Sequence, residues 1–125
     1  MMRAVMLAGF LVLAMTLSAC SAGENSPPPA IVCTTQMVPS VVVHVSDSVG
    51  APITGADVQY SVNGSAFAPA ESSYNGLYDL AYETTGNFVV RVTVGAKPLQ
   101  EKSTTVVRDG VGCHVITHDL FYIFQ

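Results

Sequence analysis

Cysteine and histidine are the residue types in this 125-residue chain best suited to carry chemistry, and there are three of each. Thiols can form disulfides, bind metals or accept covalent groups. Cys20 differs in setting from Cys33 and Cys113, because it ends an uncharged and largely apolar run that occupies residues 4–19. We therefore treat Cys20 separately from the other two cysteines.

The histidines, His44, His114 and His118, do not have the spacing of a metal site. On a helix, His114 and His118 would lie about 5–6 Å apart. The intervening Val115, Ile116 and Thr117 favour a strand instead, in which four residues span roughly 13 Å. One ion bound about 2 Å from each nitrogen cannot bridge that distance, so we expect separate surface histidines and no metal.

Catalytic motifs are equally scarce. The chain has no Gly-x-Ser-x-Gly nucleophile elbow, and its aspartates are spread singly, without calcium-loop spacing. We predict no catalytic residues, no cofactor and no enzymatic activity.

Residues 1–19 have the pattern of a secretory signal peptide. Arg3 precedes the apolar run, and small residues close it at Ser18 and Ala19. The run is short for a permanent span, which needs about 20 apolar residues. A buried helix is the alternative, but no other segment of the sequence looks able to pack beside it as a helix. We expect this segment to be removed.

Leu17-Ser18-Ala19-Cys20 resembles the lipobox of bacterial lipoproteins at all four positions. The resemblance implies a diacylglyceryl group on the Cys20 sulfur, cleavage before Cys20 and usually acylation of the new amino group, with palmitate as a typical chain. Two or three acyl chains hold a protein stably on a membrane, whereas one chain binds marginally. The alternative is an ordinary secreted protein cut after Ala19, with Cys20 as a stray thiol.

The residues after Cys20 indicate which membrane holds the protein and how the domain is connected to Cys20. In the bacterial sorting pattern, a residue other than Asp after the cysteine implies the outer membrane, and here Ser21 follows. That expectation applies to a host with two membranes.

Residues 20–32 include the triplet Pro27-Pro28-Pro29, which favours extended polyproline II. We expect a flexible Pro-rich linker between a lipid-anchored Cys20 and a domain at 33–125.

The charge balance excludes one class of partner. All nine acidic residues lie after residue 19, together with four of the five basic ones, giving that part a formal charge of −5. Such a surface repels phosphate backbones, so we expect no nucleic-acid binding.

If Cys20 carries lipid, Cys33 and Cys113 remain as an even pair in an oxidising compartment. We expect an intramolecular disulfide between them. Two buried free thiols and intermolecular pairing are the alternatives.

The rest of the chain alternates apolar and polar residues with the period of a β-strand. The expected strands are 41–46, 56–62, 77–82, 88–94, 99–107 and a run within 113–124, punctuated by turn signals such as Asn63-Gly64. About seven short strands without a helix after Cys20 predict an all-β fold, a single antiparallel β-sandwich.

The run 113–124 does not alternate cleanly. Val115, Phe121 and Ile123 fall on one face, and Leu120, with further apolar residues, on the other. A central buried strand, a bulge that switches faces and a surface covered by a partner would each produce this pattern.

A second resemblance covers residues 33–125. Its motifs are Asp47-x-x-Gly50-x-Pro52-Ile53-x-Gly55-Ala56-x-Val58, then Gly76-x-Tyr78, then Gly86-x-Phe88-x-Val90-x-Val92. They are similar to the carboxypeptidase regulatory-like domain, which has a transthyretin-like sandwich. The Cys33-Thr34-Thr35 start and Cys113-His114-Val115 finish look like short bacterial lipoproteins carrying that domain. The resemblance implies a non-catalytic accessory module.

We therefore expect a lipid-anchored, non-enzymatic envelope protein with a structural or protein-interaction role. A glycan- or small-ligand-binding module on the same anchor is the alternative. Tyr78 and Tyr82 would share a face of one strand, although the chain has no Trp. Exposed aromatic residues gathered on a sheet face would favour glycan binding, and a flat apolar patch around Leu120–Phe124 would favour a protein partner.

Overall fold

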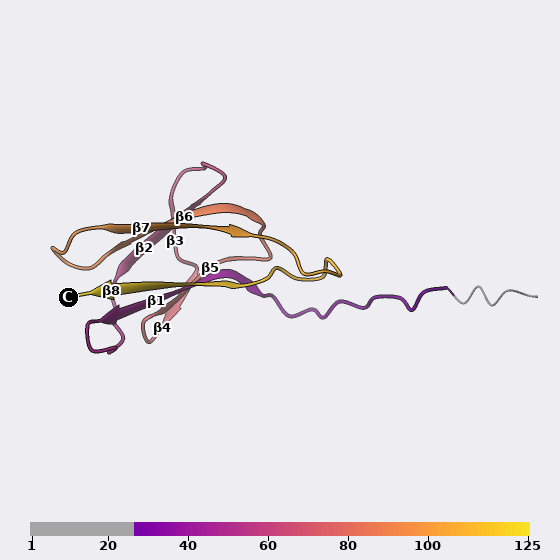
Figure 1. Ribbon diagram of the computed structural model, residues 1–125, viewed down its shortest axis with the longest axis horizontal. Helices are drawn as coiled ribbons and strands as arrows, with labels where there is room; N and C mark the ends of the chain where they lie inside the picture. Colours follow the sequence, from indigo (N-terminus) through magenta and orange to yellow (C-terminus); the bar gives the residue numbers. More distant parts are fainter. Residues whose placement is uncertain (1–26) are drawn as a thin grey trace, which may run out of the picture. The chain divides into compact units, whose positions relative to one another are not determined.

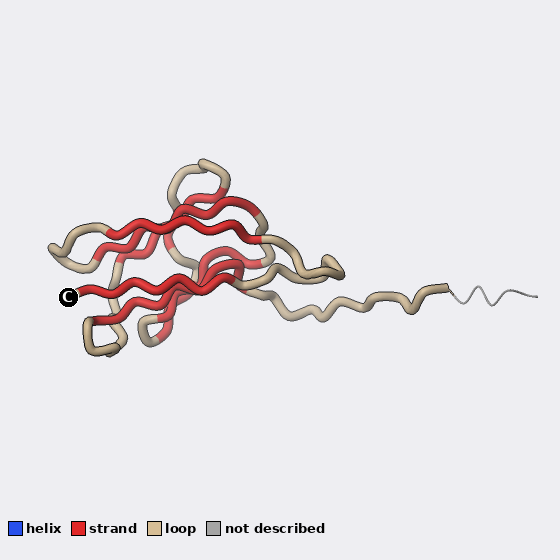
Figure 2. Tube along the Cα trace, in the orientation of Figure 1, coloured by secondary structure: helices blue, strands red, loops and turns tan. Residues whose placement is uncertain are grey.

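The structure is a computed structural model, and it describes residues 27–125. Regular structure in that part of the chain consists only of strands (Figure 2). The eight strands are β1 (Pro39–Asp47), β2 (Asp57–Val62), β3 (Ala68–Pro69), β4 (Ser72–Tyr74), β5 (Leu77–Tyr82), β6 (Gly86–Thr93), β7 (Gln100–Val106) and β8 (His118–Phe124). Within residues 27–125, we find no helix with the length and apolar character to span a membrane.

The strands form two four-stranded sheets in separate layers (Figure 1). Sheet A has the order β4-β5-β1-β8, and sheet B the order β3-β2-β6-β7. This arrangement confirms the predicted all-β sandwich. Two details differ from expectation. The short strands β3 and β4 raise the number to eight, and β8 pairs with β1 in parallel although the other pairs are antiparallel.

The alternating valines of β1 and β6 build the core between the layers. Val41 and Val43 in β1 are fully buried, as are Val90 and Val92 in β6. Burying such a side chain contributes about 1.5–3 kcal/mol relative to leaving it exposed. The alternation therefore fixes which face of each sheet points inward.

The turn after β1 packs against the start of β5. The Val45 amide donates to the Gly76 carbonyl at 2.9 Å. Gly76 has φ +79°, and a Cβ placed there would lie 2.7 Å from Pro52 Cβ. The Tyr78 hydroxyl donates to the Ile53 carbonyl at 3.2 Å. These contacts give a physical reason for a proline, a glycine and a tyrosine at these positions.

The position of β8 resolves part of the question about residues 113–124. It is an edge strand of sheet A, so the alternative of a central buried strand is wrong. Val115 lies before β8 and is buried. Within β8 the alternation is regular: Tyr122 and Phe124 point into the core, while Phe121 and Ile123 are more than half exposed.

The predicted pairing of Cys33 with Cys113 is confirmed, with Cα atoms 5.3 Å apart and 80 residues between them in sequence. Cys33 lies in a segment without regular structure, and Cys113 in the loop before β8. Residues 31–125 form one unit. The predicted signal peptide and Cys20 lie outside the described residues.

Candidate binding face on sheet A

One register row crosses the outer face of sheet A and is apolar or aromatic throughout. Tyr74 of β4 pairs with Leu77 of β5. Leu77 pairs with His44 of β1, and His44 pairs with Phe121 of β8. Tyr74 is 80% exposed and Phe121 58% exposed. Ile123, two residues beyond Phe121 on the same face of β8, is also exposed. We call these five residues the aromatic row.

His44 orders the β8 end of the aromatic row. Its ring stacks on that of Phe121, with centroids 4.4 Å apart and an interplanar angle of 21°. Its Nε2 also lies 2.8 Å from Oδ1 of Asp119. Stacking and hydrogen bonding together restrict the rotamers of this partly exposed ring. The aromatic row therefore presents a partly fixed surface.

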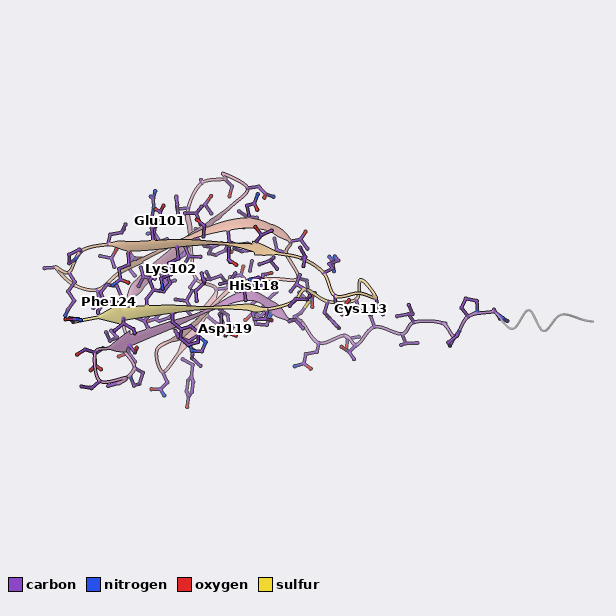
Figure 3. All side chains as sticks on the ribbon, in the orientation of Figure 1. Glu101, Lys102, Cys113, His118, Asp119 and Phe124 are labelled. Atoms are coloured by element: carbon purple, nitrogen blue, oxygen red, sulfur yellow. A yellow bond between two sulfur atoms is a disulfide. The ribbon has the colours of Figure 1, made fainter. Side chains whose placement is uncertain are left out.

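A second register row, which is acidic, runs beside the first. Asp79 of β5 and Asp119 of β8 both pair with Val42 of β1, from its two sides. Asp79 Oδ2 accepts hydrogen bonds from the Ser72 hydroxyl at 3.0 Å and the Tyr82 hydroxyl at 3.1 Å. We call Asp79 and Asp119 the acidic pair. Figure 3 shows Asp119 on the side of β8 away from β7.

The expectation that Tyr78 and Tyr82 share a face is wrong. Tyr78 is buried between the layers, whereas the Tyr82 hydroxyl reaches Asp79 on the outer face. Ala81 has φ +48°, a left-handed conformation that breaks the alternation between the two tyrosines. The exposed aromatic residues of this face are instead Tyr74 and Phe121.

An open cavity of about 240 Å³ borders the aromatic row. His44, Leu77 and Phe121 line it together with Pro52 and Gly76. The turn that packs on Gly76 thus forms one wall. The outer face of sheet A therefore combines the aromatic row with an adjoining recess.

The second histidine, His114, belongs to a polar network beside the disulfide. Its Nδ1 lies 2.6 Å from Oε1 of Glu83, and its Nε2 lies 2.8 Å from Oγ1 of Thr34. Glu83 also accepts the main-chain amides of Val38 at 2.9 Å and Val115 at 3.2 Å. The hydroxyl, imidazole and carboxylate follow the order found in hydrolases. The main-chain bonds give Glu83 a structural role, because they join its own segment to those of Val38 and of Val115.

The environment of Glu83 favours its ionised form. The hydrogen bond from His114 is the largest influence and lowers the pKa of Glu83, and the bonds from Val38 and Val115 act in the same direction. Partial burial opposes them. The Glu83 carboxylate is therefore stabilised in the folded state relative to an exposed glutamate.

His118 is placed apart from the other histidines, at the start of β8. Its Nδ1 lies 2.7 Å from the hydroxyl of Thr104 in β7. Residues 27–125 contain no group of three or more His, Cys, Asp or Glu side chains arranged to hold a metal ion. The three histidines have separate partners, and His114 is largely buried rather than a surface residue.

Sequence reasoning did not identify Tyr74, Asp79 or Asp119 as site residues. Asp119 shares its period-2 face with Phe121 and Ile123, so alternation could have grouped those three. Tyr74 and Asp79 join them only through strand pairing. Neither a protein-family model nor a curated protein matches this chain.

Proposed function

We propose that this chain is a lipid-anchored, non-enzymatic envelope protein whose β-sandwich binds a protein partner through the outer face of sheet A. The observation that carries the proposal is the exposed row of Tyr74, Leu77, His44 and Phe121, which is in register across four strands. A contiguous apolar patch on a small domain is typical of an interaction surface. Phe121 and Ile123 belong to this patch. Both lie within Leu120–Phe124, the segment in which an exposed apolar patch favours a protein partner.

The anchor in this proposal is Cys20, with outer-membrane localisation in a host that has two membranes. The support is the match of Leu17-Ser18-Ala19-Cys20 to the lipobox. The disulfide between Cys33 and Cys113 fits an oxidising compartment. It also leaves Cys20 as the cysteine available for lipid.

Intact mass of protein extracted from membranes tests the anchor. We expect a chain that starts at Cys20 and carries the added mass of diacylglycerol and an acyl group. A Cys20→Ser variant should lose the added mass and the membrane association. Retention of Met1, or an unmodified Cys20, would contradict the anchor.

Chemical crosslinking in intact cells tests the binding role. We expect the wild-type protein to form a discrete adduct, and a variant with Tyr74→Ser and Phe121→Ser to lose it. The matched control is Ser103→Ala, an exposed change on β7 of sheet B. An adduct that persists in the double variant would contradict binding through this face.

Glycan binding is the second candidate, favoured by one observation. Tyr74 and Phe121 are exposed aromatic rings at opposite ends of the row, and aromatic faces can stack on sugars. Affinity electrophoresis in gels containing cell-envelope polysaccharide distinguishes the two. Retardation that the same double variant abolishes would support a glycan ligand. Equal mobility of wild type and variant would favour the protein partner.

A further inference from the structure

The basic residues of this domain are unevenly distributed between its two sheets, whereas acidic residues lie on both. The strands of sheet A carry Asp47, Asp79 and Asp119 and contain no Arg or Lys. The basic residues of the described chain, residues 27–125, lie on sheet B or in its connections: Arg91 on β6, Lys97 after it, Lys102 on β7 and Arg108 after β7. The aromatic row therefore lies on the sheet whose strands carry acidic residues without any Arg or Lys.

The basic side chains have partners other than the acidic pair. Arg91 pairs with Glu101 at 2.6 Å. Lys97 and Lys102 donate to the main-chain carbonyls of Gln125 and Phe121 at the edge of β8. Figure 3 shows Lys102 between β7 and β8, at the edge of sheet A. No Arg or Lys within the described residues forms an ion pair with Asp79 or Asp119.

Each carboxylate of the acidic pair keeps one oxygen for a ligand. Both hydrogen bonds to Asp79 go to Oδ2, and the bond to Asp119 goes to Oδ1. Among the described residues, no other side chain donates to Asp79 Oδ1 or Asp119 Oδ2. Asp79 on β5 and Asp119 on β8 lie on the two strands that flank β1, opposite the same residue, Val42. Two strand spacings separate the aspartates, which places them about 10 Å apart across the sheet.

This geometry suits a cationic ligand. Tyr74 lies two residues along β4 from Ser72, which pairs with Asp79, and Phe121 is two residues from Asp119. A guanidinium can stack on an aromatic face within about 6 Å while it donates to a nearby carboxylate. Leu77 and Ile123 would cover apolar residues beside the cation. Charge complementarity thus selects among partners that an apolar row alone would accept.

We propose that the outer face of sheet A binds a basic protein segment in which Arg or Lys residues alternate with apolar residues. Two cations at positions i and i+2 of that segment, whose backbones are about 7 Å apart when extended, pair with Asp79 and Asp119 through their long side chains, and apolar side chains lie on the aromatic row. This inference rests on the proposed binding function and names the chemistry of the partner.

Fluorescence anisotropy with synthetic peptides tests the inference, using the full chain purified in detergent from membranes. The probes are a labelled alternating Arg-Leu peptide, a Glu-Leu peptide and an Arg-Ser peptide. We expect wild-type protein to bind the Arg-Leu peptide most tightly. Asp79→Asn with Asp119→Asn, and separately Tyr74→Ser with Phe121→Ser, should each weaken that binding roughly tenfold or more.

The matched control removes the same two charges elsewhere, by Asp57→Asn on β2 and Glu101→Gln on β7. These positions belong to sheet B, and binding should change less than about twofold because exposed charges far from the ligand are screened by salt. Equal loss in this control would show nonspecific attraction and overturn the proposal. Equal affinity for the Glu-Leu peptide would also overturn it.

The two proposals fail separately. Crosslinks at the aromatic row in cells, without preference for the Arg-Leu peptide, would overturn the basic partner and leave binding through this face intact. Absence of the crosslinks and of the preference for the Arg-Leu peptide would overturn both the binding face and the basic partner. Binding of envelope polysaccharide that depends on Tyr74 and Phe121, without peptide binding, would overturn the basic partner in favour of a glycan.

Discussion

The imidazole of His44 stacks on the ring of Phe121, with centroids 4.4 Å apart, although the two residues lie on strands that are distant in sequence. The parallel pairing of β1 with β8 places them opposite each other. Asp119 holds the imidazole from a second direction. An exposed aromatic ring is thus ordered at the β8 edge of the proposed binding face.

Substitution of Phe121 should separate binding from folding. Phe121→Ser should lower the free energy of unfolding by no more than about 1 kcal/mol, because the ring is mostly exposed and loses mainly its stacking on His44. Phe88→Ser is the contrasting variant, since Phe88 is fully buried and core truncations of this size cost about 3–5 kcal/mol. Urea unfolding of both variants measures the difference. A large loss in Phe121→Ser would mean that this face serves mainly to stabilise the fold.

The disulfide should supply a large share of the stability. It closes a loop with a sequence separation of 80 residues, for which chain entropy predicts about 4–5 kcal/mol. We expect a Cys33→Ser, Cys113→Ser double variant to show a correspondingly lower midpoint in urea. Reductant should shift the wild type toward the variant and leave the variant unchanged. A wild-type midpoint insensitive to complete reduction would contradict this role.

Glu83 should make stability sensitive to acid. Its pKa is lowered in the folded state, chiefly by the hydrogen bond from His114. A lowered pKa contributes stability above the unfolded value, and this contribution is lost as pH falls through the folded value. Glu83→Gln should therefore be less stable than wild type at neutral pH and show a weaker loss of stability below about pH 4.5. Unfolding curves from pH 7 to pH 3 measure this. Parallel pH profiles for the two proteins would contradict it.

Tyr122 should control the alkaline limit. Burial raises its pKa to about 12, and its hydroxyl donates to the Val90 carbonyl at 2.9 Å. A raised pKa gives stability that is present below the unfolded value of about 10 and is lost as pH rises toward 12. Tyr122→Phe should cost about 1 kcal/mol at pH 7 and remove this alkaline dependence. An unchanged loss of stability between pH 10 and pH 12 in the variant would show that another group is responsible.

Lys102 should protect the edge of β8 from pairing with other chains. Its ammonium donates to the Phe121 carbonyl, and Gln100 caps the Ile123 carbonyl at 2.8 Å. A lysine directed at an open strand edge disfavours edge-to-edge association. Lys102→Ala should increase self-association in sedimentation velocity relative to wild type, and Lys102→Arg should not. Identical sedimentation of all three proteins would contradict edge protection.

The sequence predicted the strands with strong alternation because period 2 follows directly from one buried face. The prediction for residues 77–82 coincides with β5. Alternation did not predict β3 and β4, because these strands are too short to show a period. The parallel pairing of β1 with β8 depends on contacts between the ends of the domain, which local patterns do not encode.

The candidate site was less predictable than the fold, because it too depends on contacts between residues that are distant in sequence. The disulfide followed from counting cysteines, but the aromatic row requires the register of four strands. The outward position of Tyr82 depends on the left-handed conformation of Ala81, and alanine gives no local signal for it. The role of Glu83 depends on three segments that meet only in the folded chain.

Site-specific photo-crosslinking in intact cells tests the central claim most directly. A photoreactive residue is placed singly at Tyr74, Ile123, Val89 and Ser103, so that two positions lie on the outer face of sheet A and two on sheet B. The account predicts that one protein is captured from positions 74 and 123 and not from 89 or 103. Capture of the same protein with equal yield from sheet B, or no capture from sheet A at wild-type expression, would contradict it.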